Sequence, residues 1–456
     1  LILFTRNESY ECPLEHATVP DTSLSAAREE QRAATQELGS IESEMVKLTP
    51  VVEALERHIR ELEGSEQYCR VRESMADMVE GRALLMTGWL ALPDEKRVSE
   101  FLEGYALWFE MNPPAKGDTI PVVLRNGPFS RLFEPITKLF QLPSYFELDP
   151  TFMIAPFFAI FFGNCLGDAG YGLTVIIATL AALFAAPKRF HGIAWLGFVL
   201  GVSTLLFGVL NSGVIFGMSI LDNTEVPGFG ALSDLVVISK DGLITPFNFA
   251  LLLGVIQMNF GMVMNIYNNL KFNSIPEALP GVGRLLIVDS CIVLFLVLSQ
   301  DMEVLRPLLV YSVAGASIGV LVLLYVALFT ELEKYLDIRV VNFVLKLYFV
   351  LSGAVGDVLS YIRLFALGLS SGILGYVVNV IALQIRGVEL VGIPIGWVLF
   401  VVFLIVGHAG NLVLSALGSF VHPLRLTFVE FYNNLEFTGG GIEYRPFRKP
   451  LEGSSV

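Results

Sequence analysis

Apolar and polar positions along the chain fall into three successive patterns, and each predicts a different kind of element. From Leu24 to Leu62, mostly apolar residues recur at alternating spacings of three and four, with Gln31 as one polar exception. This heptad seam predicts a coiled-coil helix. We expect Pro50, which lies between two seam positions, to bend or restart the helix. Because one helix cannot bury its own seam, we expect a partner helix from another subunit or from a missing N-terminal part.

Shorter apolar runs follow the heptads. The runs ALLMTGWLAL (83–92), ALWFEM (106–111) and TIPVVLRN (119–126) predict strands. Between the first two, DEKRVSEFLEGY (94–105) has the spacing of an amphipathic helix. We therefore expect a small α/β lobe over residues 71–148.

Long apolar segments dominate the chain after Asp149. Such segments are typical of membrane-spanning helices, which need about 20 apolar residues. The first segment is short, whereas the last two exceed one span, so we expect these two to be strongly tilted or to extend beyond the lipid. The prediction is a mainly α polytopic membrane protein with eight apolar segments, at about 151–166, 169–186, 192–218, 246–268, 284–300, 306–329, 340–384 and 393–435.

Composition supports a membrane protein with a cytoplasmic part. Of 456 residues, 54% are hydrophobic and only 16% are charged, which excludes an ordinary soluble globule. The net charge of −14 argues against nucleic-acid binding. Cysteines are far apart with no His cluster beside them, so we expect free thiols and no metal site. The expected domains are a coiled-coil arm (1–70), the lobe (71–148), the membrane domain (149–437) and a C-terminal tail (438–456).

The distribution of basic residues predicts the orientation. Eight spans put both ends of the chain on one side of the membrane, and the loops on that side hold most of the Lys and Arg. The positive-inside rule therefore places the arm, the lobe and the tail in the cytoplasm. The residues counted on that side are Lys188, Arg189, Lys271, Arg284, Lys334, Arg339, Arg445, Arg448 and Lys449, against Lys240, Arg306 and Arg386 on the other.

A permanent cation, Arg363, lies within the seventh apolar segment, in GDVLSYIRLFALGLSSGILGY (356–376). A charge at the centre of a membrane helix costs at least roughly 2.5–3.5 kcal/mol, and arginine does not lose its proton in proteins. Helix packing does not require this cation, which favours a partner carboxylate or a water-filled path. The small and polar residues on its face either pack against another helix or line that path; they are Ser352, Gly353, Gly356, Ser360, Ser370 and Ser371.

Asp357 precedes Arg363 by six residues, a net rotation of about 240° around a helix. We therefore expect no direct pair between them. Asp357 instead serves an aqueous entry path, contacts a neighbouring helix, or is a satisfied structural acid.

The eighth segment carries a second polar stripe. His408, Asn411 and Ser415 share a narrow face, and His422 lies about 40° away, whereas Arg425 is rotated about 100° from His408. This stripe fits either interhelical hydrogen bonding or a hydrated path.

Asp168, in CLGDAGYGL (165–173), lies between the first two apolar segments and fits a helix cap. The chain contains no GxxxxGK[ST] loop, so we expect no nucleotide site, and no cofactor.

Four stretches together resemble one family, the membrane stator subunit of V-type/A-type rotary ATPases, called subunit a or subunit I. They occur in order between about residues 80 and 449: TGWLALPDEKRVSEFL, LDPTFMIAPFFAIFFGNCLGDAGYGL, SYIRLFALGLSS and FVHPLRLTFVEFYNNLEFTGGGIEYRPF. The short LGDAGYG form and the compact loops are closer to bacterial or archaeal members. The resemblance also implies an N-terminal truncation, because the family's arm normally folds back as a paired coil.

The resemblance implies a non-catalytic subunit against which a ring of proteolipid c/K subunits rotates. It assigns the essential arginine to Arg363 and the second arginine to Arg425, with two half-channels for H⁺ or Na⁺. Expected partners are the ring, peripheral-stalk (E/G-type) and central-stalk (C/d-type) subunits, and indirectly the A/B head, in a prokaryotic plasma membrane.

This chain departs from eukaryotic members at two polar channel positions, with Ser415 in place of a glutamate and Ser371 in place of a histidine. The half-channel on the side away from the cytoplasm must therefore use other groups, and we expect Asp357, His408 and Asn411 there. Candidates for the two half-channels together are Asp357, Ser360, His408, Asn411, Ser415 and His422. The alternative function is a secondary ion-coupled transporter, which predicts similar halves with interrupted helices; no such symmetry is recognisable.

Overall fold

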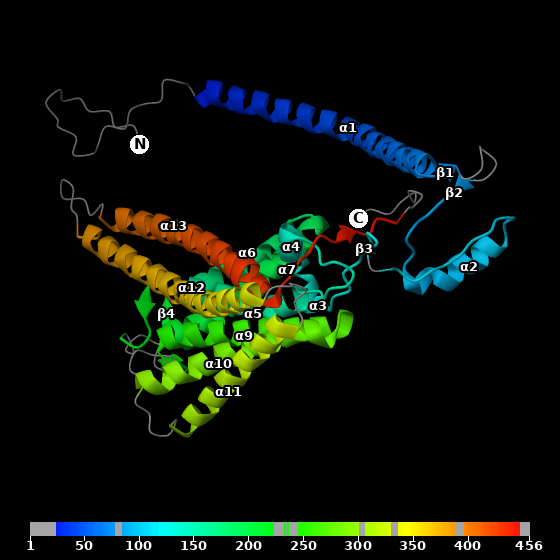
Figure 1. Ribbon diagram of the computed structural model, residues 1–456. Coiled ribbons are helices and arrows are strands. Elements are labelled where there is room, and N and C mark those ends of the chain that lie inside the picture. The colour runs from blue at the N-terminus through cyan, green and yellow to red at the C-terminus, as the bar shows by residue number, and fades with distance from the viewer. Residues whose placement is uncertain are drawn as a thin grey trace, which may run out of the picture. The chain divides into compact units, whose positions relative to one another are not determined.

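The structure is a computed structural model that describes residues 24–77, 84–115, 117–222, 232–233, 235–236, 245–300, 306–329, 336–387 and 396–446 (Figure 1). The chain divides into two compact units, residues 1–97 with 446–456, and residues 98–445. Cys12, the end of the tail and several loops used to assign the orientation lie outside the described residues. The described cysteines Cys69, Cys165 and Cys291 are free, as expected.

The first unit contains one long helix, α1 (Leu24–Glu73), at the position predicted by the heptads. It continues through Pro50, so the helix does not restart there. The seam residues Leu38, Leu48 and Leu55 are exposed. The helix is confirmed, whereas the coiled coil stays a prediction, because the described residues of this unit hold no second long helix that could cover the seam.

The strands predicted before the membrane domain are almost absent. β2 (Leu84–Leu85) pairs with β1 (Ala76–Asp77), β3 (Pro121–Val122) is equally short, and residues 106–111 form no strand. A strand needs a partner and a layer that covers its apolar face, and the side chains around these runs are mostly exposed. The other elements are η1 (Leu92–Asp94), α2 (Glu95–Glu103, the predicted amphipathic helix), α3 (Pro128–Arg131) and α4 (Glu134–Phe140).

All eight predicted apolar segments form helices, and six of them are long and apolar enough to cross a membrane. The first two have only 16 and 17 residues, whereas the last two are the longest apolar helices described. Two boundaries differ clearly from the prediction. The third segment was expected to reach residue 218, but its helical part ends at Ser212 and a short hairpin follows. The fifth helix begins at Ile275, so Arg284 lies inside it. The helices are α5 (Thr151–Leu166), α6 (Ala169–Ala185), α7 (His191–Phe207), α9 (Pro246–Phe272), α10 (Ile275–Gln300), α11 (Arg306–Phe329), α12 (Leu336–Ile385) and α13 (Gly396–Arg425).

Short elements connect or extend these helices. η5 (Leu426–Phe431), a π-helical stretch, continues α13 into α14 (Tyr432–Leu435). The others are η2 (Lys188–Phe190), the π-helical η3 (Gly208–Ser212), and the hairpin of β4 (Val214–Ile215) with β5 (Met218–Ser219).

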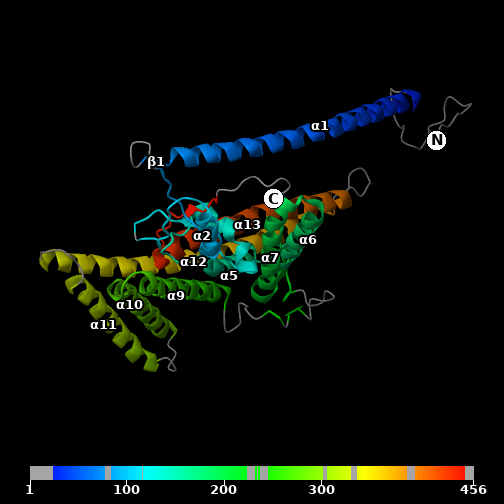
Figure 2. The same ribbon diagram turned by 90° about the vertical axis from the view of Figure 1, so that its right-hand side faces the viewer.

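Within the second unit, α12 and α13 pack side by side, as do α6 with α7 and α10 with α11 (Figures 1 and 2). The short helix α5 contacts α7, α12 and α13. Twelve of its 16 residues are buried, as expected for a helix that is apolar on all sides. α5 is thus the centre of this unit's core, which explains how a helix shorter than a membrane span fits the fold.

The turn between α5 and α6 depends on two adjacent residues. Gly167 ends α5 in the left-handed conformation with φ 57°, which glycine adopts without a steric penalty. Asp168 begins α6 as its N-cap, because its carboxylate accepts the backbone N–H groups of Gly170 and Tyr171. The predicted helix cap is confirmed.

The segment after α14 returns to the region that precedes α5. β6 (Ile442–Glu443) pairs in parallel with β3, and the Gly441 N–H donates to the Leu142 carbonyl over 2.9 Å. Lys138 forms an ion pair with Glu443 over 3.0 Å. The glycine run TGGGIEY (438–444) is therefore anchored to the segment before α5.

Candidate functional site

The two longest apolar helices carry most of the candidate residues and run antiparallel in a register fixed by polar contacts. Asn434 Nδ2, after α13, donates to Asp357 Oδ2 over 2.9 Å. Asn411 Nδ2 donates to the backbone carbonyl of Ser371 over 3.2 Å. Along α12 these contacts lie on opposite sides of Arg363, so the arginine separates two groups of polar residues.

Arg363 is only partly exposed, and its Nη1 is buried without a hydrogen-bond partner. Among the described residues, no carboxylate lies within 4.0 Å of this guanidinium. Asp357 binds Asn434 instead, in agreement with the rotation that separates it from Arg363. The cation therefore has no counter-ion in the part of this chain that the structure describes.

Arg425 differs from Arg363 because it has a nearby carboxylate. Its Nε lies 3.9 Å from Glu430 Oε1, and the Arg425 side chain is 57% exposed whereas that of Glu430 is 3% exposed. Glu430 belongs to η5, and its Oε2 is buried without a hydrogen-bond partner. The ring of His422 lies within electrostatic range of both Arg363 and Arg425.

Four residues from separate elements meet on the Asp357 side of Arg363; with Arg425 we call them the charged cluster. Asn434 is their hub: its Oδ1 accepts from Arg284 Nη2 over 2.9 Å, and its Nδ2 donates to both Asp357 and the Glu430 carbonyl. Both N–H donors of this amide and its oxygen form hydrogen bonds, which fixes its orientation. In contrast, Arg284 Nε and Glu430 Oε2 are buried and unpaired. The charged cluster is Arg284, Asp357, Arg425, Glu430 and Asn434.

A second set of residues lies on the other side of Arg363, and we call it the neutral network. Asn379 Nδ2 donates to the Phe216 carbonyl over 2.6 Å, so its Oδ1 faces His408 Nε2 at 3.0 Å. This requires a proton on Nε2 and leaves Nδ1 of the neutral ring as an acceptor. The Tyr171 hydroxyl therefore donates to His408 Nδ1 over 2.8 Å. The neutral network is Tyr171, Asn379, His408, Asn411 and Ser415.

The remaining contacts of the neutral network are equally complete. Asn411 Nδ2 donates to the oxygen of Tyr171 over 2.8 Å, and the Ser415 hydroxyl donates to Asn411 Oδ1 over 3.0 Å. Asp168 supports the network from outside, because its carboxylate also accepts the backbone N–H groups of Phe216 and Gly217. These groups join α6, α12 and α13 without a net charge, as expected for interhelical hydrogen bonding.

The structure therefore distributes the candidate residues over different places. His408, Asn411 and Ser415 lie together, Asp357 belongs to the charged cluster, and Ser360 bonds only to its own helix, donating to the Gly356 carbonyl over 3.0 Å. Sequence reasoning missed several polar residues that complete both groups. A signal existed for two of them, since Glu430 and Asn434 are four residues apart and therefore share a helix face; the others missed are Arg284, Tyr171 and Asn379.

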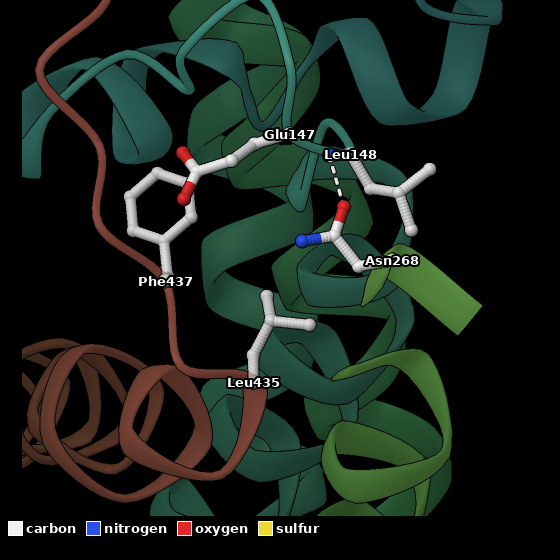
Figure 3. A pocket seen from close by; sticks show the side chains of 5 residues that line it. All are labelled: Glu147, Leu148, Asn268, Leu435 and Phe437. Atoms are coloured by element: carbon white, nitrogen blue, oxygen red, sulfur yellow. Dashed lines mark hydrogen bonds between the residues drawn. The ribbon is translucent and has the colours of Figure 1, made fainter. Parts of the chain in front are cut away.

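A small pocket beside the site is a packing junction (Figure 3). It is lined by Glu147, Leu148, Asn268, Leu435 and Phe437. The Leu148 N–H donates to Asn268 Oδ1 over 3.1 Å. Elsewhere, the Glu147 carboxylate accepts from the backbone N–H groups of Thr438 and Gly439 and from the Thr438 hydroxyl. The pocket thus joins the segment before α5 to the segment after α14.

These observations define a class of protein: an integral membrane protein of long apolar helices, with buried charged groups between its two longest ones. The V-type ATPase 116kDa subunit family matches residues 330–449, a range that includes both arginines.

Full-length relatives extend this match. The chain is 29% identical over 454 residues to A-type ATP synthase subunit I of Methanocaldococcus jannaschii, which covers 91% of this chain and 63% of the relative. It is 28% identical over 379 residues to A-type ATP synthase subunit I of Methanothermobacter thermautotrophicus, covering 80% and 52%. It is 26% identical over 404 residues to V-type ATP synthase subunit I of Borreliella burgdorferi, covering 85% and 64%.

The chain is thus similar to members of the V-type/A-type ATPase subunit I family, the family that its motifs resemble. It spans between about half and two thirds of the length of these relatives.

Proposed function

We propose that this chain is the non-catalytic membrane stator of a V/A-type rotary ATPase, which couples ATP hydrolysis or synthesis on other subunits to H⁺ or Na⁺ translocation. The observation that carries this proposal is the unpaired guanidinium of Arg363 inside α12. A fixed cation stabilises the ionised form of a carboxyl group that passes it. Each carboxyl of a proteolipid ring must therefore release its ion at Arg363, and ions do not leak past this charge.

The surface of α12 beside Arg363 supports contact with a further molecule. Apart from the neighbouring backbone of α12 itself, no described atom lies within 4 Å of a Cβ built on Gly353 or Gly356, so these small residues do not pack against another helix of the described chain. Small residues let a second helix approach closely, and in our proposal a ring helix lies there.

The two half-channels lie on opposite sides of Arg363 in this proposal. The charged cluster, with Asp357, borders the cytoplasmic one, because its unpaired buried polar atoms favour bound water. The other passes near Ser371, whose buried hydroxyl has no partner. His422 lies between them, close to both arginines.

The same proposal assigns surroundings to the other parts of the chain. The arm (1–70) contacts peripheral-stalk (E/G-type) subunits, and the lobe (71–148) lies near the central-stalk (C/d-type) subunit. The A/B head is reached only indirectly. Both termini face the cytoplasm of a prokaryotic plasma membrane.

The test is ion pumping driven by ATP in vesicles that hold the assembled complex. Arg363→Ala and Arg363→Lys should each lower pumping by far more than tenfold, because the gating charge is lost or displaced. Arg386→Ala is the matched control, since Arg386 is a cation just after α12 that stacks on Trp397, and it should pump normally. Near-normal pumping by assembled Arg363→Ala would rule out the gating role. A secondary transporter would instead take up substrate without a ring.

A further inference from the structure

The two arginines of the site are held in different ways, and Glu430 is the difference. Arg363 has no carboxylate within 4.0 Å among the described residues, whereas Arg425 faces Glu430 Oε1 through its Nε edge at 3.9 Å. More than half of the Arg425 side chain remains exposed. Its terminal nitrogens are therefore available to a second carboxylate while its inner edge faces the first.

Burial of the Glu430 carboxylate destabilises the fold unless a partner compensates its charge. Its side chain is 3% exposed, no described residue donates a hydrogen bond to its carboxylate, and Oε2 is unpaired. A buried charge without hydrogen bonds costs several kcal/mol unless a partner charge compensates. A leucine or glutamine would fill the same space more cheaply, so packing alone does not account for a carboxylate here.

The backbone around Glu430 is fixed by the rest of the charged cluster. Its carbonyl accepts from Asn434 Nδ2 over 2.7 Å, and the same amide is held by Arg284 and Asp357. Glu430 also lies in the π-helical η5, a conformation frequently found at functional sites. The backbone that carries this carboxylate is thus held by groups on α10, α12 and α14, independently of Arg425.

We propose that Glu430 is a positioning residue for Arg425: it holds the inner edge of the guanidinium, so that the outer donors meet the carboxylate of a passing ring subunit. This inference rests on the proposed function. It assigns different tasks to the two cations. Arg363 is the free charge that ejects the ion, and Arg425 is an anchored fork that orients the carboxylate for it.

The test compares Glu430→Gln and Glu430→Asp with Glu436→Gln in vesicles that hold the assembled complex, scored as ions pumped per ATP hydrolysed. Glu436 is a matched control, because it lies 3.9 Å from Arg284 but is 61% exposed. Glu430→Gln should lower the ratio about tenfold, the loss of one charge-assisted contact, with normal assembly. Glu430→Asp should recover part of this loss, and Glu436→Gln should change nothing.

Thermal stability of the complex tests the contact itself. Arg425→Gln leaves a buried charge without compensation, so the double variant Arg425→Gln/Glu430→Gln should melt higher than Arg425→Gln alone. If the melting-temperature changes of the single variants simply add in the double variant, Arg425 and Glu430 do not form a pair. An unchanged pumping ratio in Glu430→Gln, or a fall in complex amount that accounts for the lost pumping, would overturn the positioning role. If Arg363→Ala abolishes pumping and Glu430→Gln does not, only this inference fails.

Discussion

The charged cluster and the neutral network both include residues of α12 and α13, on opposite sides of Arg363, but they differ in how completely their polar groups are paired. In the neutral network, the described contacts give His408 and Asn411 a consistent set of donors and acceptors, and the network carries no net charge. In the charged cluster, Arg284 and Glu430 each keep a buried atom without a partner.

This difference separates structural from functional polarity. A saturated neutral network holds helices together and offers no free donor or acceptor to a moving ion. Unpaired buried charged groups destabilise a fold, and they are retained where water or another molecule completes them. A polar residue in a membrane helix is therefore a candidate for an ion path only if some of its hydrogen-bonding groups have no partner within the described chain.

The largest effect should come from breaking the hub of the charged cluster. Asn434→Leu removes the amide that serves Arg284 and Asp357, so two charged groups lose a partner, and the folded state should lose roughly 3 kcal/mol. We expect a clearly lower melting temperature of the purified complex and reduced pumping. An unchanged melting temperature would show that the cluster is not held together by Asn434.

A smaller effect should follow from breaking the neutral network. Tyr171→Phe keeps the buried ring but removes the hydroxyl that joins His408 and Asn411, which should cost about 1–3 kcal/mol of stability. Pumping per assembled complex should stay near wild type, because the network is structural. The matched control is Tyr376→Phe, since Tyr376 is 60% exposed on α12. If Tyr171→Phe assembles normally but loses pumping, the neutral network belongs to the conduction path and is not only structural.

The smallest effect should come from the exposed ion pair between Lys138 and Glu443, which shows how little an ion pair in solvent contributes to stability. The hydrogen bond and charge of Lys138, and more weakly Arg445, hold the pKa of the Glu443 carboxyl below its ordinary range. Because this pKa is lower in the folded state, the ionised carboxylate stabilises the fold at pH values above the ordinary glutamate pKa of about 4.3. This stabilisation is lost as the pH falls through the pKa of the folded state.

The measurement is the melting temperature of wild type and Glu443→Gln between neutral and acidic pH. The two should differ slightly near pH 7 and converge below about pH 4, and the difference should shrink in high salt. A difference that grows toward acid pH would contradict this assignment.

Much of the helical framework could be predicted because it depends on local sequence. The long helix α1 follows from heptad spacing, and the apolar helices follow from segment length. Asp168 was predicted as a cap because its partners are two and three residues away. The strands before the membrane domain failed for the opposite reason, since apolar alternation forms a strand only where a partner and a covering layer exist.

The site itself could be predicted only in part. Arg363 stands out in an apolar segment, and the separation of Asp357 from it follows from helix geometry. The partners of these residues come from distant sequence: Tyr171 meets His408 across 237 residues, and Arg284 meets Asn434 across 150. Arg284 was also assigned to a loop, because the apolar run starts there although the helix begins at Ile275. Such pairings depend on tertiary packing, which spacing within one helix does not encode.

The π-helical stretch η5 changes the direction in which side chains point around the helix axis within the last membrane segment. A π-helical turn closes its hydrogen bond one residue later than an α-helical turn, which shifts the following side chains by about 100° around the axis. The stretch lies between Arg425 and Asn434, so it sets independently which way each of them faces. Deleting one residue there would return the helix to regular winding and turn Asn434 away from α12, while Arg425 stayed in place. The π-helical winding of these six residues therefore lets one continuous helical segment direct both Arg425 and Asn434 toward the site.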